Sequence, residues 1–154
     1  MNDIAERIAT IRDFVPRLRQ QIAGLTPEQL TTPYNAPEWT VAQNVHHLVD
    51  SHVNSYIRFR LILTEEHPPL KAYDQDAWAM LADSQDANLD DSLLILQGLH
   101  ARWSRMLANI TDWDKCGFHT GAQVDYSLYD LLVIYSDHCD GHIKQIQEVL
   151  DKMA

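Results

Sequence analysis

Two histidines stand four residues apart near the C-terminus, in the segment SDHCDGHIKQI (residues 136–146). A helix brings positions i and i+4 onto one face, so the imidazoles of His138 and His142 can bind one metal ion. Zinc peptidases of the HExxH type need a glutamate directly after the first histidine, and here that position is Cys139. The pair therefore indicates either a metal site that is not a peptidase or two polar residues on a helix surface.

A third ligand has to come from another helix, and one segment offers His46, His47 and His52. At about 100° per residue, His52 falls inside the apolar stripe of that helix, His47 lies at the edge of the stripe and His46 lies well away from it. Both His47 and His52 therefore remain candidate ligands. A lone histidine in a core more often only hydrogen-bonds a neighbour, which is the alternative for His52.

His47 also belongs to a file of polar residues at helical spacing, with Asn44, Ser51, Asn54 and Arg58. Solvated helix faces usually carry Glu and Lys, whereas this file carries amides, a hydroxyl and one Arg. Asn54 and Arg58 are candidate substrate-binding residues, and a guanidinium suits a carboxylate or phosphate. The alternatives are an ordinary amide on a helix face and a surface salt bridge.

Four long stretches have the period of amphipathic helices. They run from about Asp3 to Ala23, from Thr40 to Ile62, from Asp90 to Ile110 and from Ser127 to Val149. No segment shows the alternation of a half-buried strand. The stretch 65–89 is expected to be a long connection with a short helix from Asp76 to Leu81. The sequence thus predicts an all-α protein, a four-helix bundle with a long crossover connection between helices two and three.

Two local features refine this prediction. Thr40 followed by Gln43 has the pattern of a capping box, in which a hydroxyl and an amide satisfy free backbone N–H groups at a helix start. Pro16 lies inside the first helix and is expected to bend or interrupt it.

The composition limits the function classes. The 154 residues are expected to form a single domain (1–154), with a formal net charge of −10 and no basic run, which argues against a nucleic-acid partner. No stretch approaches the ~20 apolar residues of a membrane span. The N-terminus lacks the basic start and apolar core of a signal peptide, and two cysteines do not make a disulfide framework. These features predict a cytoplasmic protein.

Three segments carry a resemblance to a known family: residues 39–78 (WTVAQNVHHLVDSHVNSYIRFRLILTEEHPPLKAYDQDAW), residues 99–107 (LHARWSRML) and residues 138–143 (HCDGHI). They resemble the YfiT-type branch of the DinB-like superfamily, whose members are described as metal-dependent hydrolases. The resemblance implies a four-helix bundle that forms a homodimer.

The resemblance also implies a divalent metal held by three histidines, one in the second position of the HH pair and two from the last helix. On this chain these are His47, His138 and His142, and the ligand type fits Zn²⁺ first and Ni²⁺ as the alternative. The last helix departs from close relatives by carrying Asp137, Cys139 and Asp140 beside the two ligands. Cys139 therefore competes as a soft ligand.

Three neutral imidazoles leave one coordination position open. A water bound there has its pKa lowered towards ~7, which suits a hydrolase acting on a small molecule. The same position can instead hold a thiolate, which suits a low-molecular-weight thiol-S-transferase, as in related family members. No side chain is assigned as catalytic, since the metal-bound water or thiolate would take that part. A non-catalytic metal- or ligand-binding bundle is the third hypothesis.

Overall fold

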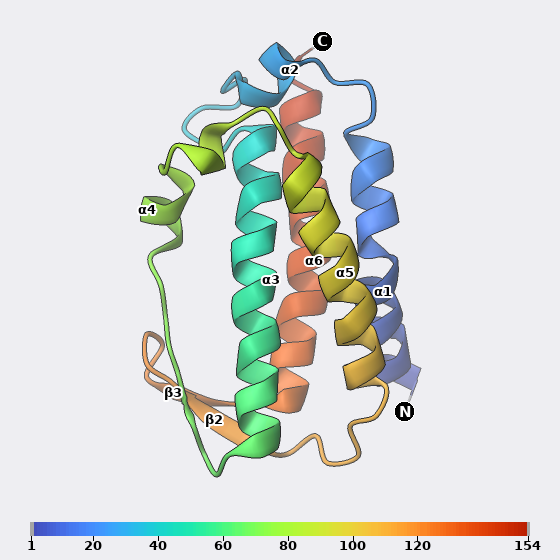
Figure 1. The fold of residues 1–154 in the computed structure, drawn as a ribbon, viewed down its shortest axis with the longest axis vertical. Helices are drawn as coiled ribbons and strands as arrows, with labels where there is room; N and C mark the ends of the chain where they lie inside the picture. Colours follow the sequence, from blue (N-terminus) through green and yellow to red (C-terminus); the bar gives the residue numbers. More distant parts are fainter. Residues whose placement is uncertain (1, 154) are drawn as a thin grey trace.

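The computed structural model describes residues 2–153 and consists mainly of four long helices packed side by side (Figure 1). These helices are α1 (Asn2–Gln21), α3 (Val41–Thr64), α5 (Asp90–Leu107) and α6 (Leu128–Leu150). Both α1 and α3 pack against α5 and against α6, so α1 and α3 stand diagonally across the bundle. The predicted four-helix bundle is confirmed, and its long connection joins the second and third helices.

The start of α3 has the geometry that its sequence predicts. The Thr40 hydroxyl accepts a hydrogen bond from the Gln43 backbone N–H at 3.2 Å, and the Gln43 side chain accepts one from the Thr40 N–H at 3.0 Å. The predicted capping box is therefore confirmed, and Ser127 with Asp130 forms a second one at the start of α6. Pro16 does not interrupt α1, which continues from Asn2 to Gln21.

The apolar sides of the four helices enclose one core, with Trp103, Phe14 and Phe59 as its largest fully buried side chains. Burying a large apolar side chain stabilises a fold by roughly 1.5–3 kcal/mol, so this cluster is a main source of stability. Two histidines lie in the same interior: His52 is 0% exposed and His100 is 2% exposed. The apolar core of the bundle thus lies directly beside these two polar side chains.

The connections contain short elements beyond those predicted. A short helix α2 (Pro27–Thr31), which is not among the helices expected from the sequence, precedes α3. The helix expected from Asp76 to Leu81 is α4 (Gln75–Ala79), which starts earlier because Asp74 caps it and ends two residues sooner. A 3₁₀ turn (Asp83–Gln85) then leads to α5.

A small sheet closes one end of the bundle, which contradicts the expectation of no strands. β2 (Cys116–His119) pairs antiparallel with β3 (Val124–Ser127), and β1 (Pro69–Leu70) pairs parallel with β2. Strands of two to four residues are too short for an alternating pattern to be visible. A Cβ at Gly117 would lie 2.8 Å from the Pro68 carbonyl oxygen, so this close pairing requires a glycine.

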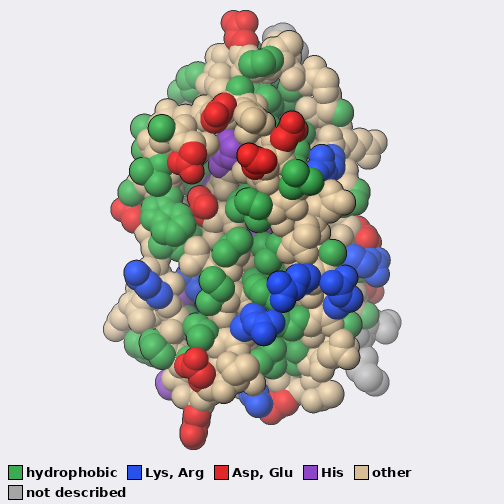
Figure 2. All heavy atoms as spheres, viewed as in Figure 1, with side chains coloured by type: hydrophobic (Ala, Val, Ile, Leu, Met, Phe, Trp, Pro, Cys, Tyr) green, Lys and Arg blue, Asp and Glu red, His purple; other side chains and the backbone are tan. Residues whose placement is uncertain are grey.

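Charges of opposite sign separate along the bundle on the face drawn in Figure 2. Acidic side chains gather towards the end that carries α4, and Lys and Arg side chains form a band across the other half. Within residues 2–153, none of the helices has the length and apolar character needed to cross a membrane.

Candidate metal centre

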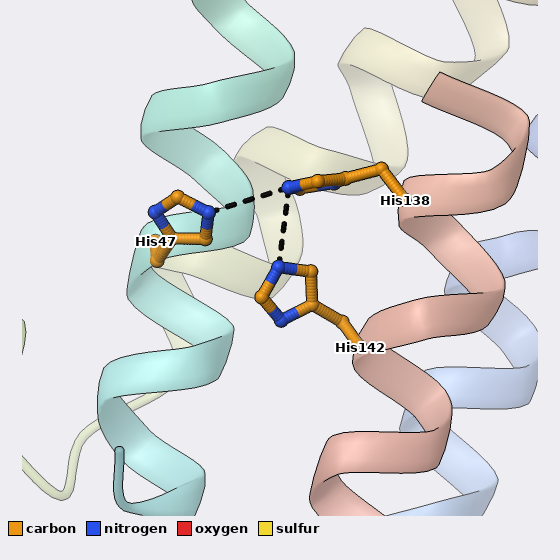
Figure 3. Close-up of side chains that lie close together, drawn as sticks. All are labelled: His47, His138 and His142. Carbon is orange, nitrogen blue, oxygen red and sulfur yellow. Dashed lines mark hydrogen bonds between the residues drawn. The ribbon is translucent and has the colours of Figure 1, made fainter. Parts of the chain in front are cut away.

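Three histidines from two helices converge in the middle of the bundle (Figure 3). His47 comes from α3, and His138 and His142 come from successive turns of α6. The His138 Nε2 atom lies 3.4 Å from Nε2 of His47 and 3.1 Å from Nε2 of His142. The structure thus brings together the three residues named as metal ligands.

The second ring nitrogen of His142 fixes the tautomer of that imidazole. His142 Nδ1 lies 2.7 Å from the Oδ1 atom of Asn44, whose Nδ2 donates to the Thr40 carbonyl oxygen at 2.9 Å. A carbonyl oxygen only accepts, so the amide nitrogen must face Thr40 and the amide oxygen must face His142. His142 Nδ1 therefore carries the proton, and its Nε2 presents a lone pair.

The tautomer of His138 is fixed by a longer chain of hydrogen bonds through the core. His100 Nδ1 lies 2.6 Å from the Ile11 carbonyl oxygen, which can only accept, so His100 Nδ1 carries a proton. His100 Nε2 then accepts from His52 Nδ1 at 2.8 Å. His52 Nε2 in turn accepts from His138 Nδ1 at 3.1 Å. His138 Nε2 is left with a lone pair directed at the other two ligands.

This assignment requires neutral rings, and burial provides them. Burial lowers the pKa of His100 to about 4 and that of His142 to about 3. It lowers the pKa of His52 and His138 well below the ordinary value, and the neighbouring histidines add to the effect. Desolvation disfavours the charged imidazolium, so the chain is neutral at physiological pH.

Two lone pairs consequently face each other across 3.1 Å, on Nε2 of His138 and Nε2 of His142. Neither nitrogen has a proton to share, so this contact is not a hydrogen bond between neutral rings. A cation between the two nitrogens turns the repulsion into two metal–ligand bonds. Nitrogens bound tetrahedrally at about 2.0–2.1 Å from one zinc ion lie about 3.3 Å apart, close to both observed distances. The donor set therefore fits a divalent metal.

A cavity of about 410 Å³ opens onto the three rings. Trp39 lines it, with its ring centroid 4.6 Å from that of His47 and stacked on His142 at 6.4 Å. No motif in the sequence singles out Trp39 as a site residue. Its position directly before the cap of α3 is the only sequence signal that places it beside His47.

The other candidate ligands lie elsewhere. His46 bonds the Ser92 hydroxyl and the Asp86 carbonyl oxygen on the far side of α3. Cys139 is fully buried in the apolar core, where desolvation strongly raises the pKa of its thiol. His52 contacts Nδ1 of His138, whereas Nε2 of His138 faces the other two candidate ligands. Among the described residues, the ring nitrogens that face one another at this centre belong to His47, His138 and His142.

The two candidate substrate-binding residues have different surroundings. The Asn54 amide donates to the Asp50 carbonyl oxygen at 2.8 Å, and Asn54 lines neither of the two cavities that His138 borders. Arg58 is only 8% exposed and lines a second cavity together with His138. A surface salt bridge, the simpler interpretation of Arg58, is therefore wrong.

The acids of the last helix do not support the ligands. Asp137 pairs with Arg7 at 2.9 Å and Asp140 pairs with Arg17 at 2.8 Å, both across to α1. The groups that orient the ligand rings are instead the amide of Asn44 and the imidazole of His52. A buried amide and an imidazole carry no charge of their own. Acidic residues near the ligands in the sequence therefore do not point to them.

Comparisons with known proteins agree with this geometry. Residues 11–146 match the family model described as DinB superfamily. The chain is 43% identical over 149 residues to "Putative metal-dependent hydrolase YfiT" of Bacillus subtilis (strain 168), covering 96% of this chain and 84% of that protein. It is 40% identical over 149 residues to a "Putative metal-dependent hydrolase" of Geobacillus thermodenitrificans (strain NG80-2), with the same coverage.

A solved structure resembles the whole fold. It is described as "YfiT from Bacillus subtilis is a probable metal-dependent hydrolase with an unusual four-helix bundle topology". The two structures superpose with a TM-score of 0.95 at 39% sequence identity, over 99% of this chain and 89% of that one. The family model, the relatives and the fold agree, and this chain belongs to the DinB superfamily.

Proposed function

We propose that this protein is a metal-dependent hydrolase that acts on a small molecule, with Nε2 of His47, His138 and His142 as the metal ligands. The observation that carries the proposal is the pair of facing lone pairs on His138 and His142, 3.1 Å apart in the interior. A divalent cation between the two nitrogens would bind both lone pairs. The names of the similar proteins from Bacillus and Geobacillus support the same chemistry.

The donor set favours Zn²⁺, which takes neutral imidazoles in tetrahedral geometry, with Ni²⁺ as the alternative. When bound, such an ion acts as a Lewis acid and lowers the pKa of a coordinated water towards ~7. The chain's own contribution is to hold two of the three rings, those of His142 and His138, in the correct tautomer before any metal arrives. Asn44 does so for His142, and His52 does so for His138.

The surroundings of the site suit a small substrate. The 410 Å³ cavity is within the range of small-molecule pockets, and the stacked indole of Trp39 forms an apolar wall beside two ligand rings. Carboxylates of Glu38, Asp76 and Glu148 line the outer part of the same cavity. A substrate in this cavity is therefore in reach of acidic groups, an apolar wall and the candidate ligands.

The first test is metal content. Protein purified without added metal or chelator is analysed for bound metal beside His138→Ala and a matched control, His46→Gln. We expect about one divalent ion per chain in wild type and in the control, and loss of the ion in His138→Ala. The control removes a buried histidine of α3 whose ring points away from the ligands. Equal metal content in all three proteins would refute the ligand assignment.

The second test separates the candidate activities on metal-loaded protein. Esters, amides and phosphoesters are screened for hydrolysis, and thiol–electrophile pairs are screened for the thiol transfer that the same ligands could support. Hydrolysis that follows metal content and is lost in His47→Ala supports the proposal. Metal-dependent thiol transfer without hydrolysis, or bound metal without any turnover, would contradict it and favour the transferase or the non-catalytic bundle.

A further inference from the structure

Arg58 is a buried cation whose hydrogen-bond partners are all neutral. Its Nη1 donates to the Tyr135 hydroxyl at 2.8 Å and its Nη2 donates to the Lys71 carbonyl oxygen at 2.7 Å. Its Nε is buried and has no partner among the described residues. Among residues 2–153, none of the ion pairs within 4.0 Å involves Arg58.

A buried charge without a counter-ion is costly, because water no longer solvates it. Buried arginines are normally paired with a carboxylate, and removing one partner of such a pair destabilises a protein strongly. The chain has 22 acidic residues, yet the guanidinium is held by a phenol and a backbone carbonyl. Both partners orient the guanidinium without neutralising it, so its charge remains available to a ligand.

The charge borders a cavity of about 250 Å³ that reaches one of the three candidate ligands, His138. Arg58 lines one part of this Arg58 cavity and the His138 ring lines another. Ser51 also lines this cavity, with its hydroxyl 3.5 Å from His138 Nε2. A ligand of a few heavy atoms can therefore contact the guanidinium while it extends towards the ligand cluster.

The Arg58 cavity differs in charge from the larger cavity on the other side of His138. No carboxylate side chain lines the Arg58 cavity, whereas three line the larger one. The field of the guanidinium also reaches across it: the pKa of His119 on the opposite wall is lowered, first by burial and then by the charge of Arg58. Gln75 and His138 line both cavities, so the two lie next to each other.

We propose that the Arg58 cavity is an anion subsite, which binds a carboxylate or phosphate group of the substrate while the group to be hydrolysed lies at the three histidines. This inference rests on the proposed function in one respect only, namely that hydrolysis takes place at a metal held by the three histidines. The planar guanidinium matches the two oxygens of either oxyanion. The substrate class is thus a small anionic ester or amide.

The test uses metal-free protein, so that an anion cannot bind to the metal instead. Acetate, phosphate and the neutral isostere acetamide are titrated, and binding is followed by saturation-transfer NMR on each probe. The Arg58 side-chain N–H resonance is followed in wild type. We expect saturable binding of at least one anion in the millimolar range, a shift of that resonance, and no saturable binding of acetamide. Comparison of acetate with phosphate identifies the preferred oxyanion.

Variants assign the binding to Arg58. Arg58→Met is expected to weaken anion binding at least about tenfold, because a charge-assisted bidentate contact is lost. Arg60→Met is the matched control, since Arg60 is an exposed arginine of the same helix whose guanidinium contacts Tyr56. If Arg58→Met does not fold, Arg58→Lys serves in its place, and it should also weaken binding because the planar fork is lost.

The outcomes separate the two proposals. Wild type that binds zinc but neither anion would overturn the subsite alone, as would equal anion binding in wild type and the Arg58 variant. Anion binding without metal binding would overturn the hydrolase and leave the subsite standing.

Discussion

The chain Ile11–His100–His52–His138 makes a strong prediction about metal affinity. In His52→Phe an aromatic ring is kept at this position, but His138 Nδ1 loses its acceptor at 3.1 Å. His138 can then present Nε2 to a metal only by leaving a buried N–H without a partner. Such a group costs about 1–3 kcal/mol, and loss of a partner that orients a metal-binding histidine typically costs about 10- to 100-fold in affinity. Zinc affinity should fall by that factor although no ligand is changed.

The assay is a competition titration of zinc against a chromophoric chelator at neutral pH. Long-range proton–nitrogen NMR of the metal-free protein reports the tautomer directly, and we expect wild-type His138 to carry its proton on Nδ1. His52→Gln should recover part of the affinity, because its amide oxygen can accept from His138. His46→Phe is the control: it breaks bonds to Ser92 and Asp86 and should lower stability without changing zinc affinity.

Two results would refute this reasoning. One is zinc binding by His52→Phe with wild-type affinity, which would show that His138 needs no partner. The other is a proton on Nε2 of His138 in the metal-free wild type, which would show that the chain does not set the tautomer. If His52 had only a structural part, both His52→Phe and His52→Gln would be less stable, but the tautomer of His138 would be unchanged.

Three further predictions concern stability, reactivity and assembly. Burial lowers the pKa of His100 from 6.5 to about 4, so the unfolded chain binds more protons in that window, and His100 alone should cost the metal-free protein about 3 kcal/mol between pH 6.5 and 4. The other buried histidines act in the same direction, and urea unfolding with the same midpoint throughout would contradict this. A thiol reagent should label the partly exposed Cys116 in native protein and spare the buried Cys139, and rapid labelling of both would refute the buried position. The homodimer implied by the family resemblance should sediment at twice the 17.7 kDa of the chain, and a monomer at micromolar concentration would exclude it.

The fold could be predicted from the sequence because its long helices carry strong periodic signals. The α3 start was visible in the Thr40–Gln43 pair, since a capping box depends only on neighbouring residues. The sheet could not be predicted, because β1 has two residues and its pairing with β2 joins segments nearly 50 residues apart. A local pattern contains no information about such a contact.

The site was only partly accessible to the same reasoning. Helical spacing placed His138 beside His142, but it left both His47 and His52 as candidates until the family resemblance separated them. The structure shows the physical difference between them: His47 Nε2 faces the other two ligands, while both nitrogens of His52 are engaged, with His100 and His138. A sequence does not show which ring nitrogens are already engaged.

The four long helices are joined at the candidate metal centre by one line of neutral groups. α1 contributes the Ile11 carbonyl, α5 His100, α3 His52 and α6 His138. A carboxylate in place of His52 would also accept from His138, but it would bring a charge into a core that is fully closed to water. It would also offset part of the metal's positive charge. A neutral acceptor avoids both effects, so an ion bound at the three histidines would keep its full charge. The placement of a second cation, Arg58, at the adjoining cavity then favours substrates that carry a negative charge of their own.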